Sequence, residues 1–354
     1  MPPLTLPLPA AEPVPRMSAS LAFFHRRALR RVWALGLGLA LLGLVLALLG
    51  LSVGSAGLEP VWQMLADPVA AQIVWDIRAP RTLGAFAAGA LLGLAGALAQ
   101  GLFRNPLADP FLLGSASGAS LGVALALVAL GVSPFAAEWA VRLGLTGAAF
   151  AGAVGAVLLT LLLARGVQHT LRLLLAGVVV GVVLGALASL VTLTHPETLQ
   201  AMQMFMLGST AFVGWSACLL MLGALVLCLG LAWALARVLD ALVLGEAAAR
   251  SLGMPLAPLR MALVAVLALA TGSAVAQTGL IAFVGLAAPH LVRAVLKTTH
   301  ARLVLLASLT GGVLLMGADT LARGLLAPQE LPVGVLTAVL GGGYLLWRMG
   351  RGVR

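Results

Sequence analysis

The chain has 354 residues, of which 62% are hydrophobic and only 9% charged. A soluble domain carries about 25% charged residues, so the composition excludes a soluble globular protein and predicts an all-α polytopic membrane protein. The net charge of +10 does not indicate a nucleic-acid partner, because the basic residues lie in short clusters between apolar stretches.

Residues 1–31 begin with a proline-rich stretch and end in a basic one, which predicts a disordered N-terminal segment. Each membrane span needs about 20 apolar residues, and the stretch 202–213 is too short for one, so we expect a half-helix or re-entrant segment there. Ten stretches qualify, within one transmembrane domain over 32–348 that is followed by a tail, 349–354: residues 32–53, 82–101, 111–130, 143–164, 171–193, 217–236, 259–278, 280–296, 303–327 and 333–348.

The distribution of basic residues supports this topology. Basic residues accumulate in cytoplasmic loops of membrane proteins. If both termini are cytoplasmic, all but four of the 21 basic residues fall on the inside, and the four outside are Arg78, Arg81, Arg142 and Arg323. The split favours ten spans with both ends in the cytoplasm.

The sequence offers little for catalysis. A phosphate-binding loop needs a lysine after glycine, but the single lysine, Lys297, follows Leu296. No metal-ligand motif is present, so we expect no metal site, no cofactor bound by the chain and no enzymatic activity. An ion-coupled secondary transporter would carry buried ionisable residues in its spans. Asp319 is the only acidic residue within a predicted span, and its spacing from Arg323 predicts an intrahelical ion pair.

A polar break separates two late spans, at about residues 238–258. Within it, "LGEAAARSLG" predicts a short helix, because Glu246 and Arg250 are one helical turn apart and Gly253 and Pro255 end the pattern. An earlier break, "RNPLADP", predicts a turn between two spans, since a residue that precedes proline disfavours helix.

Several motifs together resemble one family. The segments "RAPRTLGAFAAGALLGLAGALAQGLFRNPLADPFLLGSASGASLG", "GLIAFVGLAAPHLVR" and "GADTLARGLLAPQELPVGVLTAVLGG" are similar to signatures of the permeases of ATP-binding-cassette (ABC) importers for ferric siderophores, haem and cobalamin. The match, to a FecCD-like type II importer, runs from about Arg78 to Gly342. It departs at "GGGYLLWRM", where the family usually has a proline and a phenylalanine near Gly343 and Tyr344.

The resemblance implies a homodimer in the bacterial inner membrane that imports its cargo by alternating access. Its implied partners are a second copy, two cytoplasmic ABC ATPases that carry ATP-Mg, and a periplasmic substrate-binding protein. We expect haem as the cargo, because the chain looks most like haem permeases of Gram-negative bacteria. Ferric siderophores and cobalamin remain alternatives within the family, and an ion-coupled secondary transporter remains one outside it.

The resemblance also implies roles for individual residues. Asn105 and Leu107 would form a cytoplasmic gate, and Arg78, Arg81 and Arg323 would receive glutamates of the binding protein. For the arginines, snorkelling to the interface or pairing with Asp76 and Asp319 is the alternative. The residues implied in ATPase coupling are Gly245, Glu246, Ala249, Arg250, Leu252 and Gly253.

Overall fold

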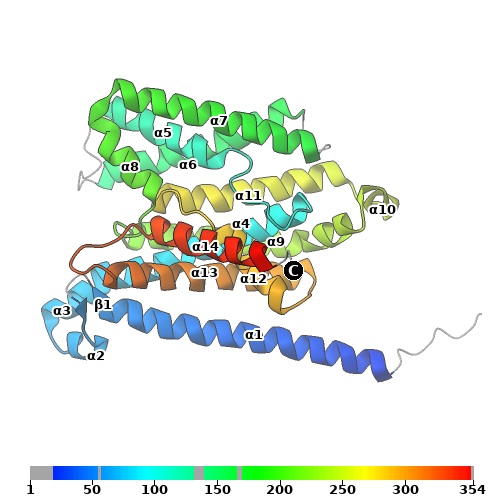
Figure 1. Cartoon of the computed structure of the whole chain (residues 1–354), viewed down its shortest axis with the longest axis horizontal. Coiled ribbons are helices and arrows are strands. Elements are labelled where there is room, and N and C mark those ends of the chain that lie inside the picture. Colours follow the sequence, from blue (N-terminus) through cyan, green and yellow to red (C-terminus); the bar gives the residue numbers. More distant parts are fainter. Residues whose placement is uncertain (1–18, 55–56, 131–138, 166–169, 352–354) are drawn as a thin grey trace, which may run out of the picture.

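The structure is a computed structural model that describes residues 19–54, 57–130, 139–165 and 170–351. Residues 1–18 of the predicted disordered segment and 352–354 of the predicted tail lie outside the described residues. The described chain is almost entirely helical, and its long helices run roughly side by side (Figure 1).

Each of the ten predicted spans corresponds to one helix. Within the described residues, seven helical segments are long and apolar enough to cross a membrane, and three apolar helices (α5, α12 and α14) are shorter. The ten are α1 (Ala19–Ser52), α4 (Ala79–Leu102), α5 (Ser115–Leu130), α6 (Trp139–Leu163), α7 (Thr170–Thr194), α9 (Trp215–Val243), α11 (Leu256–Thr278), α12 (Val284–Val295), α13 (His300–Gly324) and α14 (Val333–Arg351).

Short elements join these helices at the two ends of the bundle. One end holds a two-stranded hairpin, β1 (Val53–Gly54) and β2 (Gly57–Leu58), with α2 (Val61–Met64), α3 (Pro68–Ile73) and the π-helix η1 (Val74–Arg78). The 3-10 helix η2 (Pro196–Thr198) leads into α8 (Leu199–Leu207). The other end carries α10 (Glu246–Ser251), the start of α1 and the end of α14 (Figure 1). The described ends of the chain therefore lie on one side, as the topology predicted.

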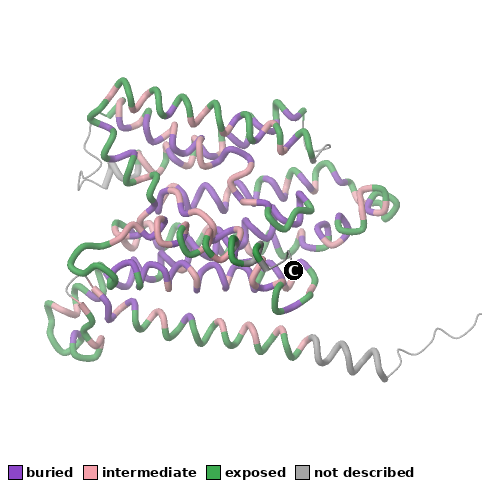
Figure 2. Tube along the Cα trace, viewed as in Figure 1, coloured by how far each residue is buried: buried purple, intermediate pink, exposed green. Residues whose placement is uncertain are grey.

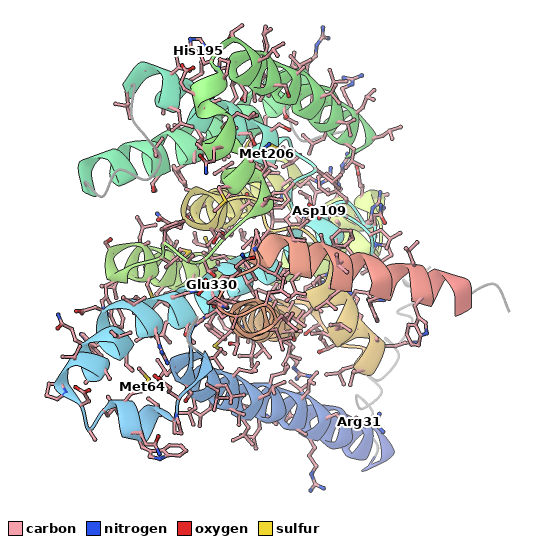
Figure 3. All side chains as sticks on the ribbon, turned by 60° about the vertical axis from the view of Figure 1, so that its left-hand side comes forward. Arg31, Met64, Asp109, His195, Met206 and Glu330 are labelled. Carbon is pink, nitrogen blue, oxygen red and sulfur yellow. The ribbon has the colours of Figure 1, made fainter. Side chains whose placement is uncertain are left out.

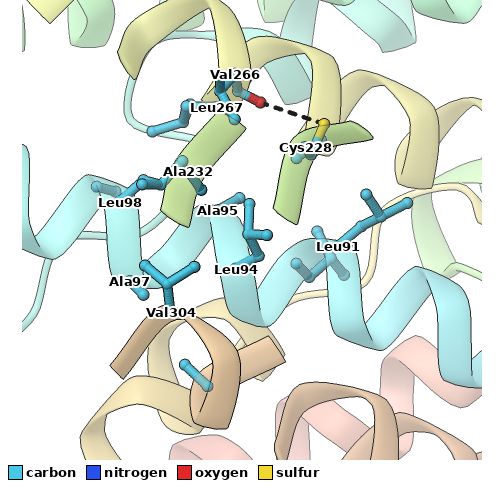
Figure 4. Close-up of a cluster of buried hydrophobic side chains, with 14 of the residues drawn as sticks. Leu91, Leu94, Ala95, Ala97, Leu98, Cys228, Ala232, Val266, Leu267 and Val304 are labelled. Carbon is cyan, nitrogen blue, oxygen red and sulfur yellow. Dashed lines mark hydrogen bonds between the residues drawn. The ribbon is translucent and has the colours of Figure 1, made fainter. Parts of the chain in front are cut away.

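Helix α4 forms the centre of the bundle. It packs against α9, α11, α12 and α13, and nearly all of its residues are buried, whereas α1 and α7 at the two edges expose long apolar faces (Figure 2). The core around α4 consists mainly of leucine, alanine and valine, with Leu91 and Leu98 fully enclosed (Figure 4). The thiol of Cys228 contacts the Val266 carbonyl oxygen there, and both cysteines are free and buried.

Small residues allow α4 to approach its neighbours closely. A Cβ atom added at Gly89 would collide with the carbonyl oxygen of Gly311 on α13, and one at Gly96 would collide with that of Gly285 on α12. Because these obstacles are backbone atoms, no side-chain rotation relieves them. The helices thus pack backbone against backbone, which is a common way for helices to associate in lipid.

One predicted span is not a continuous helix. The prediction of helix over 280–296 is wrong at its start, because α12 begins at Val284 and has 12 residues. Its length of about 18 Å is less than the hydrocarbon core of about 30 Å. Phe283, in the left-handed region at φ 69°, ends the irregular stretch before it. The Leu280 amide donates to the Phe205 carbonyl oxygen (3.0 Å) and the Ser209 amide to that of Thr278 (2.8 Å). Protein partners thus satisfy this non-helical backbone.

The span predicted over 111–130 also starts later than expected, since α5 begins at Ser115. The boundaries of three longer segments shift as well. Residues 19–31 are helical, since α1 begins at Ala19, so the predicted disordered segment is too long. The tail is helical as far as Arg351. The polar break between two spans, predicted over 238–258, covers only 244–255, because α9 continues to Val243 and α11 begins at Leu256. The predicted half-helix within 202–213 is confirmed as α8, which ends at Leu207.

We predict that Gly96→Ala destabilises the protein by about 1–3 kcal/mol, the usual cost of overpacking. Gly230→Ala on α9 is the control, because a Cβ atom there meets nothing within 4 Å and alanine favours helix. The measurement is the midpoint of thermal unfolding in detergent. Equal midpoints for the two variants would contradict the close approach of α4 and α12.

Candidate functional site

The "RNPLADP" stretch forms an exposed turn after α4. Arg104 begins it in the left-handed region, at φ 49°. The Asn105 side chain accepts a hydrogen bond from the Leu107 amide (2.9 Å), and Asp109 accepts one from the Phe111 amide (2.8 Å). Each bond spans two residues, the pattern of Asx turns. The predicted turn is confirmed. Leu107 is 56% exposed at its surface, a position that suits a gate residue.

Helix α10 lies at the same end of the molecule as this turn. Both flanking glycines have positive φ angles, 103° at Gly245 and 74° at Gly253, which other residues rarely adopt. The predicted short helix is therefore confirmed, and a glycine with a positive φ angle lies on each side of it. Ala249 is buried and Leu252 is 62% exposed, so the helix packs by one side and presents the other.

Glu246 is the charged centre of this end. Its carboxylate accepts a hydrogen bond from Arg260 of α11 at 2.7 Å, and it contacts Arg250 at 3.4 Å and Arg104 of the turn at 4.0 Å. One side chain therefore links α10, α11 and the "RNPLADP" turn. The sequence predicted the Arg250 contact from its spacing. It gave no signal for Arg104 and Arg260, which come from distant segments.

The surrounding arginines set the protonation of Glu246. The hydrogen bond from Arg260 is the main cause that lowers its pKa from 4.5, and the charges of Arg260, Arg104 and Arg250 act in the same direction. A lowered folded-state pKa means that the link is fully present above about pH 4.5 and is lost only as the pH falls through the lower folded value. At neutral pH the carboxylate is charged and the link is intact.

A large cavity lies along α5, α7 and α8. Its volume is about 650 Å³, within the range of ligand-binding cavities. The described lining contains no charged side chain and mixes hydroxyls, one amide and thioethers on an apolar wall. Met206 lies on α8 (Figure 3), in the segment predicted as a half-helix or re-entrant segment. The polar and sulfur-containing lining residues are Ser117, Ser120, Ser189, Thr192, Met202, Gln203 and Met206.

The end of the bundle opposite α10 contains a buried ionic network centred on Asp319. Its carboxylate, which is 0% exposed, accepts hydrogen bonds from Arg81 (3.1 Å), from Arg323 (2.9 Å) and from the Thr210 hydroxyl. Arg81 also pairs with Glu330 at 2.7 Å, beside α4 (Figure 3). Two arginines thus face two carboxylates, so the charges balance. The predicted Asp319–Arg323 pair is confirmed, whereas Thr210 and Glu330 were missed because they are distant in sequence.

The predicted docking arginines lie together at this end but are not exposed. Arg78, Arg81 and Arg323 are 8%, 7% and 1% exposed. Arg323 donates to the Gly50 carbonyl oxygen (2.8 Å), and Arg78 donates to that of Ser52 (3.0 Å). Each guanidinium therefore has partners within the chain. The three arginines do not form an exposed charged surface in this structure. The alternative of pairing with Asp319 is confirmed for Arg81 and Arg323, whereas Arg78 pairs with Glu59 at 3.7 Å rather than with Asp76.

We predict that Asp319→Asn lowers stability by about 3–5 kcal/mol, because it leaves two buried guanidinium groups facing a single carboxylate. The control is Asp67→Asn. Asp67 is exposed and caps α3 through a hydrogen bond from the Val69 amide (2.9 Å), a role that asparagine fills equally well. Thermal unfolding in detergent compares the two, and an Asp319→Asn midpoint equal to the control's would mean that the network adds no stability.

Comparisons with known proteins show which proteins the chain resembles over most of its length. Residues 40–351 match the FecCD transport family. The hemin transport system permease of Yersinia pestis is 38% identical over 299 residues, which cover 83% of this chain and 87% of that protein. The vitamin B12 import permease of Salmonella paratyphi A is 39% identical over 335 residues, which cover 94% and 99%.

A solved structure shares the fold at the level of the whole chain. A metal-chelate type ABC transporter in an inward-facing conformation superposes with a TM-score of 0.78 at 31% identity, over 88% of this chain and 98% of that one. The family match and the relatives together assign the sequence: the chain belongs to the FecCD transport family and is a membrane-spanning permease subunit of an ABC importer.

Proposed function

We propose that two copies of the chain form the pathway of an importer that moves haem from the periplasm to the cytoplasm of a bacterium. The chain itself hydrolyses no nucleotide, and two ATPase subunits carrying ATP-Mg dock on α10. The observation that carries the proposal is the Glu246 link, since it joins an exposed helix to the turn that holds Asn105 and Leu107. Movement of α10 would thereby reach that turn.

The proposed orientation places α10 and both described chain ends in the cytoplasm of a bacterial inner-membrane protein. It rests on the excess of basic residues at that end, which matches the charge rule for membrane proteins. The lipid bilayer would contact the apolar faces that α1 and α7 expose.

The coupling surface consists of α10 and its two glycines. We propose that Leu252, exposed beside Gly253, enters a groove of the ATPase, while Ala249 keeps the helix against α9. Arg250 has a side chain that is 66% exposed, so it remains available to a carboxylate of the partner. Glu246 faces the membrane domain and transmits the movement. Gly245 allows the positive φ angle with which the chain turns into α10.

The periplasmic binding protein would dock at the opposite end. Arg81 is the arginine that supports this proposal, because its partner Glu330 has a side chain that is 27% exposed. A glutamate of the binding protein could take the place of Glu330 on the same guanidinium. Arg78 and Arg323 would then stabilise the structure of that end through their hydrogen bonds to the end of α1.

The cargo would cross along the cavity of α5, α7 and α8. Its uncharged wall of hydroxyls and thioethers offers contacts to a bulky chelate without binding it tightly. The similarity to a hemin permease supports haem. The comparable similarity to a vitamin B12 permease keeps cobalamin as the second candidate, and a ferric siderophore is the third.

The test is uptake into proteoliposomes that contain the permease with its ATPase and binding protein. We expect accumulation of haem that requires ATP on the ATPase side and stops when ATP is replaced by a non-hydrolysable analogue. ATP-dependent uptake of cobalamin or a ferric siderophore, without haem, would overturn the cargo and keep the importer. Uptake driven by an ion gradient without the ATPase would instead indicate a secondary transporter.

A further inference from the structure

A second, smaller cavity lies behind the "RNPLADP" turn, at the end of the bundle that carries α10. Its volume is about 270 Å³. Four segments enclose it: the end of α4 with the turn, the end of α9, helix α12 and the start of α13. The polar side chains in its wall are Gln100, Arg104, Asn105, Arg293 and His300. It is separate from the cavity of α5, α7 and α8, since the two share no lining residue.

The positive charge in this cavity exceeds the negative charge that faces it. Arg293 donates to the amide oxygen of Gln100, and among the described ion pairs none joins Arg293 to a carboxylate. The carboxylate nearest to Arg104 is that of Glu246 at 4.0 Å, and this group is already bound by Arg260 at 2.7 Å.

The neighbouring groups do not supply the missing charge. His300 uses its Nδ1 atom and its amide to contact Asp240, at 2.7 and 2.9 Å, so this carboxylate is committed to the start of α13. Gln100 donates to the Leu286 carbonyl oxygen at 3.2 Å, which fixes the amide oxygen that holds Arg293. Arg293 is thus held in place by a neutral group.

A partly buried guanidinium without a carboxylate is costly, and an anion in the cavity would compensate it. Guanidinium groups bind phosphate oxygens in pairs, and basic pockets between membrane helices bind lipid head groups. We propose that this cavity binds a phosphate group, either free phosphate or the head group of an anionic phospholipid. The bound group contacts Arg104 of the turn and Arg293 of α12, and so fastens the turn that bears Leu107 to the bundle.

The test uses the purified full-length protein in nanodiscs. Thermal unfolding is measured in phosphatidylcholine, in an equal mixture of phosphatidylcholine and phosphatidylglycerol, and in phosphatidylcholine with inorganic phosphate replacing chloride at constant ionic strength. A ligand that binds only the folded state raises the midpoint, and we expect a shift of at least about 2 °C. A shift with phosphatidylglycerol alone identifies the lipid head group, and a shift with inorganic phosphate identifies the free anion.

Variants separate this site from a general effect of charge. Arg293→Gln should abolish the shift, and Arg293→Lys, which keeps the charge without the fork, should reduce it. Lys297→Gln is the matched control, because Lys297 is exposed just after α12 and does not line the cavity, so its shift should equal that of the wild type. No shift in either condition, or an equal shift in Arg293→Gln and Lys297→Gln, would overturn the proposal. The readout involves no transport, so its failure leaves the proposed importer function standing.

Discussion

The close approach of α4 to α12 and α13 is the constraint on which the rest of the structure depends. Lipid supplies no hydrophobic force between helices, so their association relies on packing and polar contacts. At Gly89 and Gly96 the packing is between backbones, which leaves no room for even one methyl group. This contact holds α4 rigidly in the centre of the bundle, and α4 in turn positions a candidate functional element at each of its ends.

The two ends of α4 are connected to neighbouring elements by ion pairs of different kinds. At its start, Arg81 joins the Asp319 network, which ties α4 to α13 and to the segment after α8 through Thr210. That network is buried and charge-balanced, which suits a permanent connection. At its end, the exposed turn with Leu107 is joined to α10 by the partly exposed Glu246. Exposed ion pairs are weak and easily rearranged, which suits a movable connection.

The sequence predicted those features that depend on local composition or spacing. The helices of the ten predicted spans follow from apolar stretches, and α10 follows from Glu246 and Arg250, one turn apart, with Gly253 and Pro255 after them. The irregular stretch before α12 could not be predicted, because its apolar residues look like those of a helix. Protein partners such as the Phe205 carbonyl oxygen make its non-helical backbone possible. The burial of Arg323 was also not predicted, because its partner, the Gly50 carbonyl oxygen, lies far away in sequence.

In the proposed mechanism, ATP-driven movement of α10 reaches the turn through Glu246. Its most direct test is the distance between spin labels on Leu107→Cys in the two subunits of the assembled importer, measured with and without ATP, in a background where Cys218 and Cys228 are alanine. We expect that ATP shifts this distance when Glu246 is present and that the shift is lost in Glu246→Gln. A distance that ATP leaves unchanged, or that shifts equally in Glu246→Gln, would contradict it.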